Sequence, residues 1–374
     1  MTTDALAEKL SAVGAAFRLP GTFSGYTELK NGNINQTYKV TYTVTDACGA
    51  AREKSYLAQK INTAAFKNPV ELMENIDRVT AFLRQKRPDA VHLHFHHIAT
   101  GENYLREPDG FWRMSNYVRS VTFNSGENLD VVRAAGEAFG DFQMLLSDFD
   151  AAALHETIPD FHDTRKRYAA LKAAVAADSC GRLSACEDEV AWLLSVEDAA
   201  CTLTDAFRRG ELPLRVTHND TKINNVLFDG ETLLPLVVID LDTVMPGLVG
   251  QDFGDAIRFA ANAGGEDCED LSRVCVDMAV FRAFCDGFLS KTARVLTARE
   301  IETLGISSFA LTCELAARFL TDYLCGDVYF KVKREGHNRL RARAQIALAK
   351  DMQRRLPEMT DACITAAKTY RGEM

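Results

Sequence analysis

The segment RVTHNDTKINNVLFD, residues 215–229, is the most informative part of the chain. Two short apolar runs enclose a dense polar loop in it, and a further apolar run, LVVIDLD (236–242), follows at once. Short runs rich in Val, Ile and Leu predict strands, and the polar residues between them predict a connecting loop. Side chains on such loops often carry function, because the flanking strands hold them in place.

The side chains in this loop are those that phosphoryl transfer requires. That chemistry needs a carboxylate to orient the attacking hydroxyl, ligands for Mg²⁺ and a cation beside the transferred group. His218, Asp220 and Asn225 have the HxDxxxxN spacing of a kinase catalytic loop, and Lys222 supplies the cation. Asp240 follows fifteen residues after Asn225, where a second metal ligand is expected. A lone His-x-Asp indicates only turn capping, but the complete set predicts a kinase site.

Two further carboxylates compete with Asp240 for the metal role. Asp252 begins the tripeptide Asp-Phe-Gly of protein kinases, but it lies 27 residues beyond Asn225, after a Pro-Gly turn. We therefore expect Asp252 to cap the following helix or to anchor the catalytic loop. Asp242 remains open as an additional metal ligand.

The chain as a whole divides into a strand-rich and a helix-rich part. The first part begins with a predicted N-terminal helix, followed by three predicted strands at 24–30, 37–44 and 55–61. A helix opened by Asn68-Pro69 is predicted at 69–85, and two more strands at 92–99 and 111–118. The second part shows helical spacing at 129–147, 164–176 and 188–209 and again after residue 252. This order predicts an α+β, protein-kinase-like bilobal fold. Residues 1–120 would form a nucleotide-binding lobe with a five-stranded antiparallel sheet, and residues 121–374 a mainly helical lobe carrying the catalytic loop and the acceptor site.

Six segments in this order resemble the aminoglycoside phosphotransferase and choline kinase superfamily, and most closely its N-acetylhexosamine 1-kinases. They are NGNINQTYKV (31–40), AQKINTAAFKNPVELMENI (58–76), THNDTKINNVLFD (217–229), VIDLDTVMPGL (238–248), DFGDAIRF (252–259) and RFLTDYLCGDVYFK (318–331). The resemblance implies transfer of the γ-phosphate of ATP, with Mg²⁺, to the anomeric hydroxyl of N-acetylglucosamine or N-acetylgalactosamine. It also implies that Asp220 is the catalytic base, that Lys222 lies beside the γ-phosphate and that Asn225 and Asp240 hold Mg²⁺. His218 is expected to brace the loop.

The nucleotide-binding residues are expected in the first lobe. The turn after the first strand would cover the phosphates with Asn31, Gly32, Asn33, Asn35 and Thr37. Lys60 on the third strand is expected to reach the phosphates and to pair with Glu74. A one-residue register change would put Gln59 in place of Lys60, and Glu71 is the alternative to Glu74. Backbone groups near Asn116 and Val118 are expected to bind the adenine edge.

The acceptor is less constrained by the sequence than the chemistry. Arg318 and Asp322 lie at i and i+4 of one helix and are expected to contact the acceptor, although an exposed ion-paired face has the same spacing. The segment 161–168, FHDTRKRY, starts a helix and also resembles the N-acetylhexosamine kinases. Choline, homoserine, an aminoglycoside or another sugar remain alternative acceptors, and a silent nucleotide-binding protein is the alternative to an enzyme.

Composition sets the remaining expectations. The chain of 374 residues has a formal net charge of −9, which argues against a nucleic-acid partner. Its ten cysteines form no CxxC pair, and no apolar run approaches the ~20 residues of a membrane span. These features predict a cytoplasmic protein with free thiols, a small-molecule substrate and no membrane partner; the oligomeric state stays open. VHLHFHH (91–97) suggests zinc only weakly, since metal sites usually draw ligands from separate elements.

Overall fold

The computed structural model describes residues 3–29, 34–46 and 48–373, and the chain forms two compact units. The first unit comprises Met1–Ser120 together with Leu241–Val244, and the second comprises Val121–Asp240 and Met245–Met374. The short segment Leu241–Val244, which directly follows Asp240, therefore belongs to the strand-rich unit, although the sequence places it among residues of the helical one.

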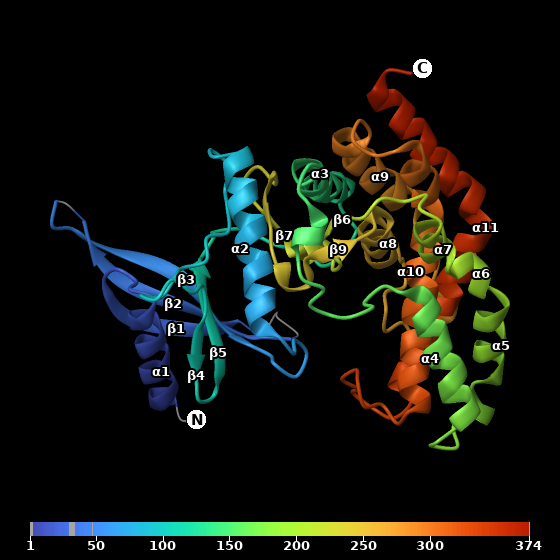
Figure 1. The fold of residues 1–374 in the computed structure, drawn as a ribbon, viewed down its shortest axis with the longest axis horizontal. Coiled ribbons are helices and arrows are strands. Elements are labelled where there is room, and N and C mark those ends of the chain that lie inside the picture. The colour runs from blue at the N-terminus through green and yellow to red at the C-terminus, as the bar shows by residue number, and fades with distance from the viewer. Residues whose placement is uncertain (1–2, 30–33, 47, 374) are drawn as a thin grey trace. The chain divides into compact units, whose positions relative to one another are not determined.

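The first unit contains the predicted five-stranded antiparallel sheet (Figure 1), with the strand order β1-β2-β3-β5-β4. Its elements are α1 (Thr3–Ala16), β1 (Thr22–Leu29), β2 (Gln36–Thr45), β3 (Ala51–Ile61), α2 (Pro69–Lys86), β4 (Leu105–Glu107) and β5 (Gly110–Asn116). α2 begins as expected, with Pro69 in its first turn and the Asn68 side chain accepting a hydrogen bond from the Glu71 N–H at 3.4 Å.

The strand predicted at 92–99 is wrong. That segment forms a single bridge, between Phe95 and Ser115, and two backbone hydrogen bonds join it to β5. The edge of β5 is already occupied at its start, because the Pro108-Asp109 turn folds β4 back so that Leu105 pairs with Trp112. Gly110 adopts φ +135°, which a side chain would hinder, and so permits this tight return.

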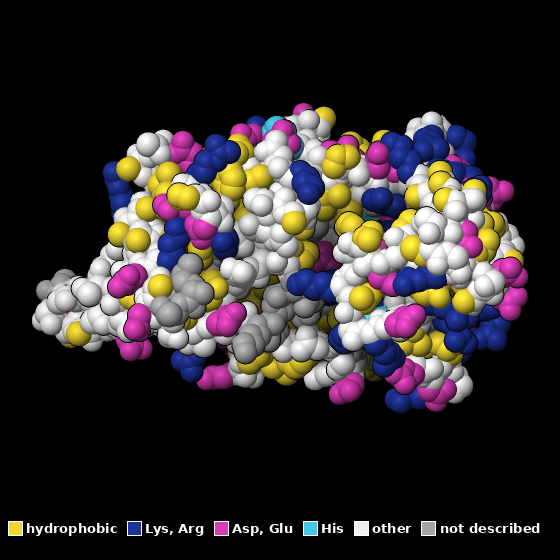
Figure 2. Space-filling view, turned by 90° about the horizontal axis from the view of Figure 1, so that it is seen from below, with side chains coloured by type: hydrophobic (Ala, Val, Ile, Leu, Met, Phe, Trp, Pro, Cys, Tyr) yellow, Lys and Arg dark blue, Asp and Glu magenta, His cyan; other side chains and the backbone are white. Residues whose placement is uncertain are grey.

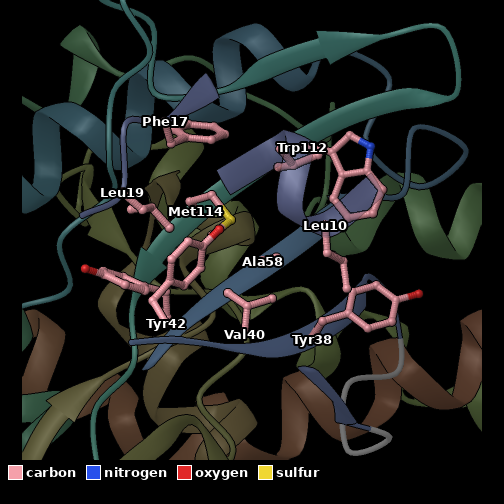
Figure 3. Packing of buried hydrophobic residues seen from close by; sticks show 11 residues of the cluster. Leu10, Phe17, Leu19, Tyr38, Val40, Tyr42, Ala58, Trp112 and Met114 are labelled. Carbon is pink, nitrogen blue, oxygen red and sulfur yellow. The ribbon is translucent and has the colours of Figure 1, made fainter. Parts of the chain in front are cut away.

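The two faces of the sheet carry different residues. Figure 3 shows the apolar cluster on the α1 face, where Leu10 packs with alternate residues of three strands: Tyr38, Val40 and Tyr42, Tyr56 and Ala58, and Trp112 and Met114. Because side chains alternate along a strand, Lys60 lies on this α1 face and Gln59 on the opposite one. Arg113 also lies on the opposite face, where it contacts the Met73 sulfur of α2 at 3.8 Å.

The second unit is mainly helical, as predicted, and holds two small two-stranded sheets. Its elements are α3 (Leu129–Leu145), α4 (Thr164–Ala177), α5 (Glu187–Ser195), α6 (Glu197–Ala200), α7 (Thr202–Arg208), β6 (Arg215–Thr217), β7 (Val226–Phe228), β8 (Pro235–Val238), β9 (Met245–Gly247), α8 (Val249–Ala260), α9 (Met278–Thr292), α10 (Ala298–Leu324) and α11 (His337–Arg371). β6 pairs with β9, and β7 pairs with β8.

The single helix predicted at 188–209 is instead broken into α5, α6 and α7. Acidic residues of α6 and α7 converge on one guanidinium, that of Arg165, which contacts Glu197, Asp198 and Asp205 at 3.4, 2.9 and 2.5 Å. Residues 197, 198 and 205 would also lie on one side of an unbroken helix, because positions i, i+7 and i+8 share a face, so these ion pairs alone do not account for the breaks.

All ten cysteines are free thiols, as expected. Among the described residues, α10 alone is long and apolar enough to cross a membrane, and 83% of its apolar window is buried inside the protein, as in a globular core. Acidic and basic side chains are intermixed on the face shown in Figure 2.

Candidate active site

The catalytic loop is anchored by a buried carboxylate. Asp252, in α8, accepts hydrogen bonds from the backbone N–H groups of His218 and Asn219 at 2.9 and 2.7 Å and from the Gln143 amide at 2.6 Å. Burial raises the pKa of Asp252, although these donors and His218 oppose that rise. Of the two roles expected for Asp252, the structure therefore shows the anchoring of the loop.

His218 braces the loop from inside. Its Nε2 lies 2.8 Å from the Ile239 carbonyl oxygen, and its Nδ1 lies 3.3 Å from the Asp220 backbone nitrogen. Because Nδ1 faces a donor and Nε2 faces an acceptor, the consistent tautomer carries its proton on Nε2. The ring is fully buried and packs edge-on against Phe139 and Phe142. Both nitrogens are thus occupied, which is the structural role expected for this residue.

Asp220, Lys222 and Asn225 come together at the tip of the loop. The Lys222 Nζ lies 2.7 Å from Asp220 Oδ1, and the Asn225 amide donates to Asp220 Oδ2 at 3.0 Å and to the Asp220 carbonyl at 2.8 Å. The Asp220 side chain is 26% exposed, so a solvent-borne hydroxyl can reach it. Desolvation opposes the charge of Lys222, but Asp220 and Asp255 outweigh it and raise the pKa of Lys222. The group is therefore a cation at neutral pH.

A second buried carboxylate on α8 supports the other side of the loop. Asp255 accepts from the Thr221 N–H at 3.1 Å and pairs with Arg258 at 2.6 Å. Burial alone would raise the pKa of Asp255, but Arg258 and Lys222 lower it. The sequence contained a signal for this pair of anchors in Asp252 and Asp255, which are three residues apart and thus lie on one face of the helix.

The surroundings of Asn225 and Asp240 suit a hard cation. The Ile239 N–H donates to the Asn225 carbonyl at 2.8 Å, which holds the residue before Asp240 beside the catalytic loop. The Asn225 side-chain nitrogen is used by Asp220, so its oxygen is the atom left for a metal, and the Asp240 side chain is exposed. Oxygen ligands of this kind, completed by phosphate and water oxygens, are those that Mg²⁺ prefers.

The histidines of 91–97 have separate partners. His92 Nε2 lies 2.5 Å from the Arg87 carbonyl, His94 contacts Arg84 and His97 contacts Asp77. Among the described residues, no group of three or more His, Cys, Asp or Glu side chains is placed to hold a metal ion. The zinc interpretation therefore gains no support.

The expected lysine–glutamate pair of the first unit is wrong. The Lys60 Nζ lies 3.0 Å from Asp109 Oδ2, on the α1 face of the sheet, whereas Glu74 lies in α2 and contacts Arg78 at 3.5 Å. The register of β3 explains the difference, since Gln59 is the residue that faces away from α1. Sequence alternation alone could not choose between the two positions.

The other nucleotide-binding predictions have mixed outcomes. Asn31, Gly32 and Asn33 lie outside the described residues. The Asn116 N–H donates to the His94 carbonyl at 3.0 Å, and its side-chain oxygen accepts from the His94 N–H at 2.7 Å. The Asn116 N–H is therefore not free to bind an adenine edge, and Val118 remains the predicted contact.

A buried ion pair that the sequence did not predict lies on the face of the sheet opposite α1. Arg113 Nη1 of β5 lies 2.5 Å from Asp242 Oδ1, and the Asn35 amide donates to Asp242 Oδ2 at 2.6 Å. Gln59 bridges Arg113 Nε at 2.9 Å and the Thr37 hydroxyl at 3.1 Å. Both Asp242 oxygens therefore have protein donors, and the expectation that Asp242 is an additional metal ligand gains no support. The only signal in the sequence was one arginine inside the apolar run of β5.

The two residues predicted to contact the acceptor, Arg318 and Asp322, have different surroundings in the structure. Arg318 lies 5.3 Å from the Phe161 ring and within 6 Å of the rings of Tyr329 and Phe330, an arrangement that holds a guanidinium over aromatic faces. Asp322 is buried, and its carboxylate accepts from three backbone N–H groups, at Val328, Tyr329 and Phe330, and from the Asn338 amide. Its predicted acceptor role is wrong, because these donors saturate it.

Next to Arg318 lies a buried dyad that the sequence suggested only through the segment 161–168. His162 Nδ1 lies 2.8 Å from Glu314 Oε1, and the Thr164 hydroxyl donates to Glu314 Oε2 at 2.7 Å. Burial would raise the pKa of Glu314, but His162, Arg318 and Thr164 lower it. The carboxylate is therefore ionised and fixes the orientation of the imidazole.

A cavity of about 230 Å³ lies next to this dyad and to the catalytic loop. Its lining includes Phe161, His162, Asn219 and Gln251, with acidic residues at 156, 160 and 163. A larger cavity of about 460 Å³ is lined by residues of α5 and α11, among them Glu189, Arg339 and Arg343. The catalytic loop contributes Asn219 to the smaller cavity and no residue to the larger one, so the smaller cavity is the candidate acceptor pocket.

Three solved structures share this fold over nearly the whole chain. A microcompartment-associated aminopropanol kinase matches with a TM-score of 0.63 and 16% identity, covering 94% of this chain and 98% of its own. Choline kinase from Cryptosporidium parvum matches with a TM-score of 0.58 and 11% identity, covering 94% and 97%. Spectinomycin phosphotransferase in complex with ADP and spectinomycin matches with a TM-score of 0.51 and 11% identity, covering 92% and 98%.

Residues 25–279 match the model of one protein family, which is described as the phosphotransferase enzyme family. The match contains β2, β3, the catalytic loop and Asp240, and thus the residues whose geometry is given above. The chain is a phosphotransferase that belongs to this family.

Proposed function

We propose that the chain is an ATP- and Mg²⁺-dependent kinase that phosphorylates the anomeric hydroxyl of an N-acetylhexosamine. The observation that carries the kinase reaction is the arrangement of Asp220, with one oxygen on Lys222 at 2.7 Å and the other on Asn225 at 3.0 Å. A carboxylate held next to a fixed cation and a metal-ligand amide is what an in-line attack on a γ-phosphate requires. The ADP complex of the related spectinomycin phosphotransferase supports ATP as the donor.

Each residue has a defined task in this reaction. Asp220 orients the acceptor hydroxyl and takes its proton, and Lys222 stabilises the charge on the transferred phosphoryl group. Asn225 and Asp240 would hold Mg²⁺, which neutralises the phosphate oxygens when bound. His218, Asp252 and Asp255 keep the loop rigid, so that little reorganisation is needed during the reaction.

The charges around the smaller cavity favour a neutral acceptor. Each acidic side chain in its lining already has a partner: Glu156 accepts from the Asp160 N–H at 2.8 Å, Asp160 pairs with Lys166 at 2.6 Å, and Asp163 pairs with Arg208 at 3.0 Å. An amine acceptor, such as those of the aminopropanol and choline kinases, calls for unpaired carboxylates or an aromatic cage. Here the Phe161 ring, which lines the cavity, already carries the Arg318 guanidinium at 5.3 Å. An N-acetylated sugar fits this balance.

Phosphorus NMR of the protein with ATP, Mg²⁺ and N-acetylglucosamine or N-acetylgalactosamine tests the proposal. We expect ADP and an anomeric sugar 1-phosphate to appear together, and neither to appear with Asp220→Asn. If ATP stays intact with both sugars, the N-acetylhexosamine assignment fails. A panel containing choline, aminopropanol, homoserine and an aminoglycoside then shows whether the acceptor is an amine. If ATP stays intact with every member of this panel, the kinase reaction itself is refuted.

A further inference from the structure

We propose that Arg113 and Asp242 replace the lysine–glutamate ion pair expected on β3 and α2, and that this pair positions the metal ligand Asp240. The inference rests on the proposed ATP- and Mg²⁺-dependent reaction. It assigns a positioning role to two residues outside the catalytic loop and outside every nucleotide contact that the sequence predicted.

The pair is buried, and both of its residues belong to the first unit. Arg113 and Asp242 are 2% and 3% exposed, and their contact of 2.5 Å is a charge-assisted hydrogen bond. Arg113 also lies 5.5 Å from the Phe95 ring and 3.8 Å from the Met73 sulfur. A cation surrounded in this way needs its carboxylate partner, because an unpaired buried charge is strongly destabilising.

Gln59 of β3 is chemically complementary to the Arg113 cation. Gln59 occupies the side of β3 that faces away from α1, where a lysine was expected, and it is neutral. Its amide oxygen accepts from Arg113 Nε at 2.9 Å, and its amide nitrogen donates to the Thr37 hydroxyl at 3.1 Å. A lysine here would bring a second positive charge against the buried guanidinium, whereas glutamine supplies the acceptor that Arg113 needs and a donor for β2.

The carboxylate partner connects this network to the metal ligands. Asp242 follows Asp240 by two residues, and its second oxygen accepts from Asn35, which precedes β2. The Asn75 amide of α2 donates to the Val244 carbonyl at 3.0 Å in the same buried region. Contacts from β5, α2 and the turn before β2 therefore fix Leu241–Val244, the segment that carries on directly from Asp240.

This arrangement predicts that loss of the ion pair weakens Mg²⁺ binding more than acceptor binding. If Arg113 or Asp242 loses its partner, the segment after Asp240 loses its buried ion pair, so the position of the proposed metal ligand becomes less defined. Residues that orient metal ligands affect metal affinity on the order of 10–100-fold. The acceptor cavity is lined by residues of the second unit, so the KM for the acceptor should change much less.

The test compares Arg113→Met, Asp242→Asn, the double variant and the conservative Arg113→Lys with the wild type. The readouts are the Mg²⁺ concentration that gives half-maximal activity, the KM values for ATP and acceptor, and Mg²⁺-dependent binding of a fluorescent ATP analogue. We expect roughly tenfold or greater increases in the Mg²⁺ requirement for each single charge removal, a smaller increase for Arg113→Lys, and a double variant no worse than the singles. Arg106→Met is the matched control, because Arg106 lies in the same hairpin and stacks on Phe111; its constants should not change.

The outcomes separate this inference from the proposed function. Wild-type Mg²⁺ requirements in folded Asp242→Asn and Arg113→Lys proteins, checked by circular dichroism, would overturn the positioning role while the kinase reaction stands. An equal loss of all constants would also overturn it, because that pattern indicates general destabilisation. If the wild type binds no ATP analogue in the presence of Mg²⁺, the proposed function itself has failed. Arg113→Lys retains the charge, which keeps the test decisive if Arg113→Met does not fold.

Discussion

At Asp220 the two carboxylate oxygens have different partners, and this asymmetry defines the chemistry. Oδ1 faces the Lys222 ammonium and Oδ2 faces the Asn225 amide. An incoming hydroxyl must share one of these oxygens with an existing donor, so Asp220 orients the nucleophile in a direction fixed by its neighbours. The backbone of the loop is itself held by Asp252 and Asp255, which makes this direction a property of the folded chain.

Replacement of Asp220 by asparagine tests the role of the carboxylate. We expect kcat to fall by about 10²–10⁴-fold, because the base is lost while its shape is kept, and the KM for ATP to stay within about twofold of the wild type, since the kinase template gives this aspartate the acceptor hydroxyl rather than ATP. Steady-state kinetics with the acceptor found by phosphorus NMR would measure both constants. Glu231→Gln, an exposed carboxylate between β7 and β8, is the control and should behave as wild type. A kcat near the wild-type value in Asp220→Asn would reject the assignment.

At the scale of elements, the spacing of motifs predicted more than the register of strands. The HxDxxxxN pattern located the catalytic loop and the carboxylate of Asp240, because these residues depend on local sequence. The face of Lys60 depends on the pairing of β3 with β2 and β5, and a shift of one residue reverses it. The sequence likewise could not show that Arg113 is buried, since its partner Asp242 lies 129 residues away.

The position of Lys60 on the α1 face predicts a structural rather than a nucleotide-binding effect. Lys60→Met should leave the KM for ATP unchanged and lower the free energy of unfolding, because the Asp109 carboxylate loses one of its cations. Urea unfolding and ATP kinetics on the same variant would separate the two roles. A KM for ATP raised by an order of magnitude, with unchanged stability, would restore Lys60 to the phosphate site.

The same cluster predicts a dependence of stability on pH. Burial alone would raise the pKa of Asp109, but Lys60, Lys9 and Trp112 lower it from 3.8 to about 2. A carboxylate whose pKa is lower in the folded state stabilises fully above about pH 4, and the contribution is lost as the pH falls towards 2. After allowance for solvent screening, Asp109→Asn should cost about 1 kcal/mol at pH 7. Urea unfolding from pH 7 to pH 3 should show the difference shrinking; a constant difference would indicate that Asp109 acts through packing.

At the scale of the whole molecule, the chain passes between its two units three times, after Ser120, Asp240 and Val244. The two crossings at Asp240 and Val244 enclose the segment that Asn35, Asn75 and Arg113 fix in the first unit. The proposed metal ligand Asp240 therefore lies at a covalent junction between a unit that supplies a buried ion pair and a unit that supplies the catalytic loop. Composition and periodicity predicted a strand-rich and a helix-rich part of the chain. They did not predict that the four residues Leu241–Val244 belong to the first unit, because this depends on contacts between residues distant in sequence.

A ligand that binds only the folded chain stabilises it by mass action, which makes nucleotide binding measurable without any acceptor. With Mg²⁺ present and ATP at 100 times its dissociation constant, the expected gain in the free energy of unfolding is about 2.7 kcal/mol. Asp240→Asn should retain the part of this gain that ATP gives in EDTA and lose the part that Mg²⁺ adds, because the exposed Asp240 carboxylate is the proposed metal ligand. Thermal unfolding of both proteins with ATP, and with Mg²⁺ or EDTA, would measure the two increments. A full Mg²⁺ increment in Asp240→Asn would show that other residues bind the metal. If the wild type shows no Mg²⁺ increment, the chain does not bind nucleotide in a Mg²⁺-dependent way.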